Sequence, residues 1–296
     1  MFADRLGLSA RTVYLLFGAW GGFSWSLINA AWFLYYVNVA HLGPLQLVLV
    51  GTTLEASYFV WEIPTGVLAD TFSRRVSVIA GTGIMMAVRT STLLVALLAA
   101  EFFWGAASEG WDRLSDAHLL LDLNFPPLGL TPVVAFGVLS LVCTVLIVVT
   151  AQLVRRLMRS VDEHVVSRML VGLQVARIAC QAAFVFAPSS ALALVPYLIN
   201  SMFRASFYPL FNAWLIRRTD ASVRATVLST TSVSSALGQV GGGPISGAIG
   251  NVYGIPLGLL SSVAMLLPGT LFFARAVGLR AGTPAPDAVA ARATTA

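Results

Sequence analysis

The chain has 296 residues, of which 57% are hydrophobic and only 10% are charged. Soluble domains carry about 25% charged residues, so this composition excludes an ordinary soluble domain and indicates a polytopic membrane protein. The net charge is +5, and every basic residue other than histidine is an arginine. Because these arginines fall at the ends of apolar runs, they indicate membrane topology and not nucleic-acid binding.

Eight apolar segments are long enough to cross a bilayer, since about 20 apolar residues in a helix span a hydrocarbon core of roughly 30 Å. In chain order they are 12–39, 45–69, 75–107, 132–156, 165–187, 190–216, 223–249 and 255–277. The sequence therefore predicts an all-α, polytopic membrane helix bundle with eight spans. The first run is too long for a signal-peptide core and is expected to be a retained span.

The arginines also predict the orientation of these spans. If the N-terminus is cytoplasmic, the arginines on the cytoplasmic side are Arg5, Arg11, Arg74, Arg75, Arg155, Arg156, Arg159, Arg168, Arg217, Arg218, Arg224, Arg275 and Arg280. The connections on the opposite side carry only Arg113. Cytoplasmic loops are enriched in basic residues, so both termini are expected in the cytoplasm of a multi-pass protein of the cell (plasma) membrane.

The third segment, 75–107, is longer than a membrane is thick, at about 50 Å for 1.5 Å per residue. Arg89 lies in its middle. Two alternatives fit: a long tilted helix with Arg89 facing a polar cavity, or a short piece at 75–87 followed by a span that starts at Thr90. Residues 108–131 are then expected to form an external loop, partly helical and lying at the membrane interface through Trp111, Leu114, Leu119 and Leu121.

Enzyme chemistry finds little support in the sequence. The three histidines, His41, His118 and His164, lie in loops or at span ends, and there is no HExxH pair, glycine-rich phosphate loop or Cys/His metal spacing. Cys143 and Cys180 both lie inside apolar segments, which argues against a disulfide framework. We therefore expect no catalytic residue, metal or cofactor.

Polar residues deep inside the spans are the candidates for a solute or proton pathway, because such groups are costly at membrane depth. They are Trp25, Asn29, Glu55, Glu62, Arg177, Asn200, Arg204 and Asn212. The alternative is that they bond one another and hold the bundle together. A glycine-rich stretch offers a helix-packing surface or a hinge through Gly238, Gly242, Gly243, Pro244 and Gly247.

The turn that closes the second span carries the most specific motif, Gly66-Val-Leu68-Ala-Asp70-Thr-Phe-Ser73-Arg74-Arg75. It resembles the signature loop between the second and third helices of the major facilitator superfamily. Gly66, Leu68, Asp70, Arg74 and Arg75 match that pattern, and Ser73 replaces its second glycine. The preceding Glu62-Ile-Pro-Thr is similar to members that export drugs.

The resemblance implies a partial fold of this superfamily. Residues 1–88 correspond to helices one, two and the start of three, and 89–280 to the C-terminal half, helices seven to twelve. Helices four to six are missing, with a junction near Met85–Arg89. The tail, 281–296, is rich in Ala, Pro and Thr and is expected to be disordered.

The family mechanism is alternating access around a site near mid-membrane. The resemblance implies transport of small organic molecules, expected to be proton-coupled efflux, with sodium coupling or uniport as open alternatives. It also implies that Asp70 latches onto the N-terminal end of helix eleven, near Ser222–Ala225, while Arg74 and Arg75 face anionic headgroups. The expected partners are a small-molecule substrate and the lipid bilayer, with no nucleic acid. The alternative function is a truncated, non-transporting remnant that is inactive or needs homo-oligomerisation.

Overall fold

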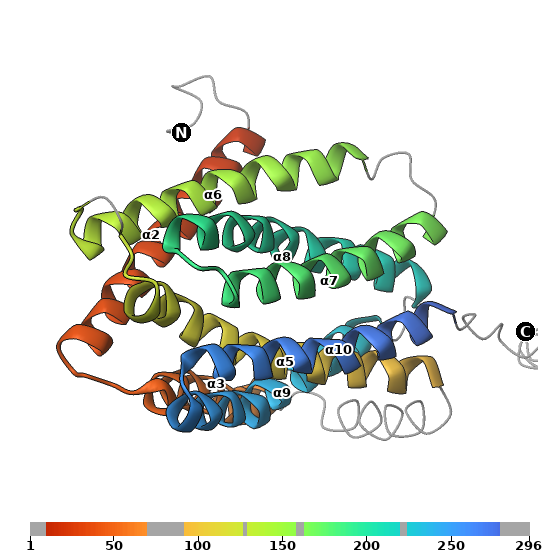
Figure 1. Cartoon of the computed structure of the whole chain (residues 1–296). Helices are drawn as coiled ribbons and strands as arrows, with labels where there is room; N and C mark the ends of the chain where they lie inside the picture. Colours follow the sequence, from red (N-terminus) through yellow and green to blue (C-terminus); the bar gives the residue numbers. More distant parts are fainter. Residues whose placement is uncertain (1–9, 70–91, 127–128, 158–162, 220–223, 279–296) are drawn as a thin grey trace, which may run out of the picture.

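The computed structural model describes residues 10–69, 92–126, 129–157, 163–219 and 224–278. All regular structure in these ranges is helical, which confirms the predicted all-α bundle. The elements are α2 (Ala10–Asn38), α3 (Pro44–Ala69), α5 (Thr92–Ala117), the π-helix η2 (His118–Asp122), α6 (Pro132–Leu157), α7 (Glu163–Val185), α8 (Ser190–Arg218), α9 (Arg224–Tyr253) and α10 (Ile255–Gly278). Figure 1 shows most of them running side by side, with α2 crossing the bundle obliquely.

Each of the eight predicted segments overlaps one α-helix of 23 to 30 residues within the described ranges. By length and composition, four described stretches are apolar enough to cross a membrane: Thr92–Asp122, Pro132–Val154, Val165–Val185 and Ile255–Gly278. A helix satisfies its own backbone polar groups, which is the condition for entering the hydrocarbon core. These stretches indicate a membrane-associated bundle.

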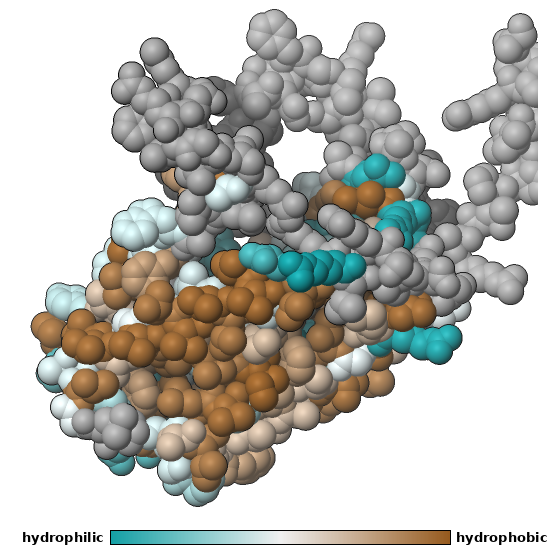
Figure 2. Space-filling model, turned by 90° about the horizontal axis from the view of Figure 1, so that it is seen from above, coloured by the Kyte–Doolittle hydropathy of each residue, from teal (hydrophilic) through white to brown (hydrophobic). Residues whose placement is uncertain are grey.

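The outer surface of α6 agrees with that conclusion. Val134, Val138, Leu141, Val145 and Val149 recur at intervals of three or four residues, and all are exposed. Residues at this spacing share one helix face. Figure 2, which views the bundle from above, shows a broad apolar surface interrupted by few hydrophilic side chains. An apolar surface of this extent fits a lipid environment better than water.

The third predicted segment requires a correction. The described helix α5 begins at Thr92 and continues to Ala117, so residues 108–117 are helix and not the start of an external loop. The predicted helical continuation is confirmed and extends through η2 to Asp122. Trp111, Leu114 and Leu119 are buried in the bundle and do not anchor this segment at the membrane interface as predicted, whereas Leu121 is 51% exposed. The physical reason is that the charged residues of this segment find partners inside the protein.

Helix α5 is the centre of the packing. It contacts α9, α10 and α3, while α7 packs on α8, α6 packs on α2 and α8, and α10 connects to α7. Gly254 alone separates α9 from α10, and its φ of 96° is a left-handed conformation that favours glycine and reverses the chain. Helices α2 and α3, from residues 1–88, lie against α5, α6 and α9, from residues 89–280.

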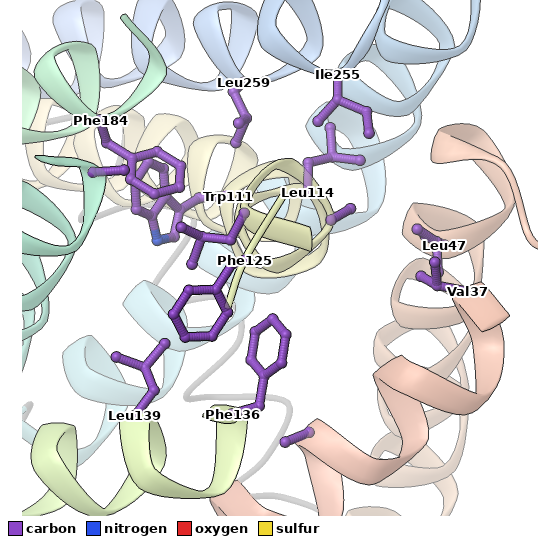
Figure 3. Packing of buried hydrophobic residues seen from close by; sticks show 14 of the residues in the cluster. Val37, Leu47, Trp111, Leu114, Phe125, Phe136, Leu139, Phe184, Ile255 and Leu259 are labelled. Atoms are coloured by element: carbon purple, nitrogen blue, oxygen red, sulfur yellow. The ribbon is translucent and has the colours of Figure 1, made fainter. Parts of the chain in front are cut away.

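Two aromatic clusters hold α5 in place. Toward its C-terminal end, Trp111 contacts Phe184 of α7 at 5.1 Å between ring centroids, and Phe125 contacts Phe136 of α6 at 5.2 Å. Figure 3 shows these rings converging with Leu114 and Leu259. Further back along α5, Trp104 packs edge-on against Phe207 of α8 at 4.7 Å. Such aromatic pairs add about 0.5–1.5 kcal/mol each beyond the apolar area that they bury.

Candidate functional site: a charged cavity inside the bundle

Four carboxylates share one face of α5. Glu101, Glu109, Asp112 and Asp116 follow one another at i, i+8, i+11 and i+15, which places them within an arc of about 80° at 100° per residue. We call these residues the α5 acidic stripe. Ionisable groups inside membrane helices face the bundle interior or a water-filled cavity and mark functional pathways. Their partners therefore decide what the site can do.

Asp112 forms the two-pronged ion pair of the stripe. Arg204 of α8 donates from Nη2 to Asp112 Oδ2 at 2.6 Å, and its Nη1 donates to Oδ1 of the same carboxylate. This bidentate geometry matches a planar guanidinium to a planar carboxylate and joins α5 to α8. About a third of each side chain is exposed, so the pair borders an open space.

Glu109 and Asp116 have different kinds of partner. Arg113 Nε donates to Glu109 Oε1 at 3.0 Å within α5, and the Tyr197 hydroxyl of α8 donates to Asp116 Oδ1 at 3.1 Å. The Glu109–Arg113 pair lies against the backbone of α3. A Cβ atom at Gly51 would stand 1.7 Å from Glu109 Oε1, so the ion pair in its present position requires glycine there.

A cavity of about 290 Å³ opens between α2, α3 and α5, and we call it the central cavity. Its lining comprises Trp25, Asn29, Trp32, Phe33 and Tyr36 of α2, Leu47, Val50, Leu54 and Glu55 of α3, and Asp112, Arg113 and Asp116 of α5. One wall is thus aromatic, and the α5 wall carries two carboxylates and one arginine. This combination of apolar surface with a few convergent charged groups is typical of a small-molecule site.

Two further cavities adjoin the central cavity. One, of about 200 Å³, shares Asn29 and Asp116 with it and extends between α6 and α8. The other, of about 480 Å³, shares Glu55 and is lined by residues of α5, α8 and α9, including Glu101. We call it the Glu101 cavity. The shared lining residues make the three cavities neighbours along the interior of the bundle.

The structure brings three of the predicted pathway residues together in the central cavity: Trp25, Asn29 and Glu55. Asn29 Nδ2 donates to the Trp25 carbonyl at 2.8 Å, one turn earlier in α2. Glu55 lies 11 residues into α3, about 16 Å from its start, and lines both the central and the Glu101 cavity. Arg204 reaches the same region through its pair with Asp112.

The remaining predicted residues lie elsewhere. Asn212 lines the Glu101 cavity. Arg177 and Asn200 are buried and line none of the three cavities. Arg177 Nη1 donates to Gln174 Oε1 at 2.7 Å, and Asn200 Oδ1 accepts from Gln181 Nε2 at 3.3 Å, so the Asn200 contact joins α8 to α7. Arg177 also lies within electrostatic reach of Arg204 and Asp112.

The signature motif is only partly visible. Glu62, Gly66 and Leu68 fall within helix α3, but their side chains are outside the described residues. Asp70, Arg74 and Arg75 lie outside the described residues, as do the proposed junction at 85–89, the tail at 281–296 and most of the predicted latch partner at 222–225.

The glycines of α9 face two neighbouring helices. A Cβ at Gly238 would stand 1.9 Å from the Phe102 carbonyl oxygen of α5, and one at Gly242 would stand 2.3 Å from Ala106 Cβ. Gly243 lies between α5 and α3, where its Cβ would stand 2.8 Å from Glu109 Cγ and 3.1 Å from Thr52 Oγ1, and Gly247 faces α3, where its Cβ would meet Val48 Cβ at 3.0 Å. Pro244 lies within α9 between these two contacts. The structure thus places these residues in close helix packing.

Sequence reasoning missed the α5 acidic stripe: it assigned Glu109, Asp112 and Asp116 to a loop, and it did not select Glu101 although this residue lies in the predicted span 75–107. The spacing of the four acidic residues on one helix face was the signal that could have found them.

Within the described residues, no group of three or more His, Cys, Asp and Glu side chains is arranged to hold a metal ion. The sequence matches no protein-family model and no curated protein.

Proposed function

We propose that this chain spans the membrane with eight helices, as a shortened relative of the major facilitator superfamily, and moves small organic molecules by alternating access as proton-coupled efflux. One observation carries the proposal: a charged, partly aromatic cavity lies inside a bundle whose outer surface is apolar. A soluble bundle has no need of an apolar outer surface, and a purely structural membrane protein has no need of a charged, partly aromatic cavity.

The lining of the central cavity suggests the substrate class. The tryptophans Trp25 and Trp32 offer flat apolar faces, and Glu55 and Asp116 offer negative charge. Aromatic faces and carboxylates together favour a cation with an apolar body, because the ring quadrupole and the carboxylate both attract positive charge. The proposed substrates are therefore aromatic organic cations, and ethidium is a suitable probe.

Helix directions support the resemblance. The Cβ positions of Gly243 and Gly247 approach Thr52 and Val48 in reverse order, so α3 and α9 are antiparallel. The C-terminal end of α3, at Ala69, and the start of α9, at Arg224, are consequently on the same side of the bundle. This is the side on which the resemblance predicts that Asp70 meets the N-terminal end of helix eleven, where a carboxylate gains about 0.3–1 kcal/mol.

A cell-based assay tests the proposal. We expect cells that express the wild-type chain to accumulate less ethidium than cells with an empty vector. Asp70→Asn and Glu62→Gln, which remove negative charge at the proposed latch and in the second span, should abolish most of the difference. If wild-type and empty-vector cells accumulate the probe equally, with the protein present in the membrane, transport by this chain is excluded.

One observation favours the alternative of a non-transporting or oligomer-dependent remnant. Trp25 and Trp32 line the central cavity and are nevertheless 63% and 50% exposed. Their exposure leaves the cavity open on the side of α2, where a full family member has further helices by resemblance. A second copy of the chain would cover this side. The mass of the purified protein in detergent, measured by light scattering, separates a monomer from such a dimer.

A further inference from the structure

Glu101 differs from the other carboxylates of the α5 acidic stripe. Its exposed fraction is 3%, it lines the Glu101 cavity, and it has no hydrogen-bond or ion-pair partner within the described part of the chain. Glu109 is equally buried, at 3%, but receives a bond from Arg113. Asp112 is paired with Arg204, and Asp116 accepts from Tyr197. Three of the four acids are thus compensated, and one is not.

The surroundings of Glu101 do not supply the missing positive charge. The ionisable groups that line its cavity are Glu55 from α3 and Tyr208 from α8, one acidic and one phenolic. Helix α9 contributes the neutral side chains Thr231, Ser232, Ser235 and Gln239. On the side of α10, the neighbouring residues Phe103 and Trp104 of α5 pack against Phe272 and Phe273. The lining of this cavity includes no arginine or histidine.

An ionised carboxylate in this position would be a buried charge without a counter-ion. Proteins avoid that state by neutralising the group. Protonation forms one O–H bond at an Oε atom, with a proton that hydronium of the solvent supplies. The hydroxyl and amide groups around Glu101 can accept or donate hydrogen bonds in either protonation state, so they permit both.

We infer that Glu101 is the residue that binds and releases the coupling proton, in a cavity separate from the substrate cavity. The inference rests on the proposed transport function and adds the identity and place of the coupled site. Glu55 provides the connection, because it lines both cavities. A cation beside Glu55 would disfavour a second positive charge in the adjoining cavity. Substrate binding would therefore promote release of the Glu101 proton to water, as antiport requires.

Infrared spectroscopy of the full-length protein in lipid nanodiscs tests the protonation site without any transport measurement. A protonated carboxylic acid has a C=O stretching band that the carboxylate lacks. We expect the wild type to show this band at neutral pH and to lose it reversibly at alkaline pH. Glu101→Gln should remove the band. The matched control Glu109→Gln, at the same burial on the same helix, should retain it.

A second variant guards against a trivial loss of structure. Glu101→Asp keeps a carboxyl group, and we expect the band to return at a shifted frequency. Folding of each variant is checked by its thermal unfolding transition in detergent. A band that persists in folded Glu101→Gln, or a wild type that shows no protonated carboxyl at neutral pH, overturns the inference.

Transport of ethidium into proteoliposomes then separates the two proposals. We expect Glu101→Gln to reduce the ethidium uptake driven by a pH gradient at least tenfold. Exchange of ethidium at equal pH on both sides should continue. Uptake by Glu101→Gln that still follows the pH gradient, or wild-type uptake driven by a sodium gradient at constant pH, contradicts the inference. If the wild type moves no ethidium under any gradient but the infrared result holds, the transport proposal fails and the protonation site remains.

Discussion

At the scale of single residues, most carboxylates inside the bundle are compensated by polar side chains, several of which come from a neighbouring helix. The Asp112–Arg204 contact joins α5 to α8, and the Asp116–Tyr197 contact repeats that link one turn further along. The Glu109–Arg113 pair stays within α5 but lies against Gly51 of α3. Such pairs add little net stability, since desolvation offsets much of the attraction.

Breaking the Asp112–Arg204 pair should therefore cost more than the pair itself contributes. We expect Asp112→Asn to lower the free energy of unfolding in detergent by roughly 1–3 kcal/mol, because Arg204 loses its only carboxylate partner among the described contacts. The double exchange Asp112→Arg with Arg204→Asp should recover at least half of the loss. Failure of the exchange to improve on the single variant would show that the pair is not the source of the effect.

At the scale of elements, the α5–α9 contact is built from small residues at every fourth position. Ser234 Oγ donates to the Leu98 carbonyl at 2.8 Å, and the Cβ positions of Gly238 and Gly242 would overlap α5. This spacing keeps one narrow face of α9 against α5, so that backbones approach as closely as in small-xxx-small membrane pairs. The two helices should move as one body.

Two glycines of α9 offer a matched test of this contact. Gly238→Ala would place a methyl group 1.9 Å from a backbone oxygen that cannot rotate away, so we expect a loss of about 1–3 kcal/mol in unfolding free energy. The nearest atom to a Cβ at Gly241 is Phe102 Cζ, at 3.9 Å. Gly241→Ala should be neutral or stabilising by up to about 1 kcal/mol, from helix propensity. Equal effects of the two substitutions on thermal unfolding would refute the close contact.

The sequence alone predicted the helices better than the site. Each long apolar run overlaps an α-helix in the described part of the chain, because apolar length and backbone satisfaction are local properties. The predicted end of the third segment at 107 was wrong because Glu109, Asp112 and Arg113 were assigned to an external loop, whereas their partners lie on α5 itself and on α8. Depth along a helix identified Glu55 and Asn29, but equally selected Arg177, which points into the α7–α8 region. The position of a residue along its helix determines its depth in the membrane. The direction in which its side chain points depends on helices that are distant in the chain.

At the scale of the whole molecule, the exposed face of α6 makes the membrane environment testable. Spin labels at Val134, Val138 or Val145, placed in the reconstituted protein with Cys143 and Cys180 replaced by alanine, should collide with dissolved oxygen and not with a water-soluble nickel chelate. A label at the buried position Leu139 should collide with neither. Frequent collisions of the spin labels with the nickel chelate at all three exposed positions would show that this face is in contact with water.

The most direct test of the account is flux through the protein in isolation. Purified wild-type chain, as the only protein in liposomes, should move ethidium across the bilayer when a pH gradient is imposed, and Glu55→Gln should reduce the initial rate at least tenfold, because Glu55 lines both the central and the Glu101 cavity. Folded, correctly inserted protein that gives the same ethidium flux as protein-free liposomes would contradict the account and leave the non-transporting remnant in its place.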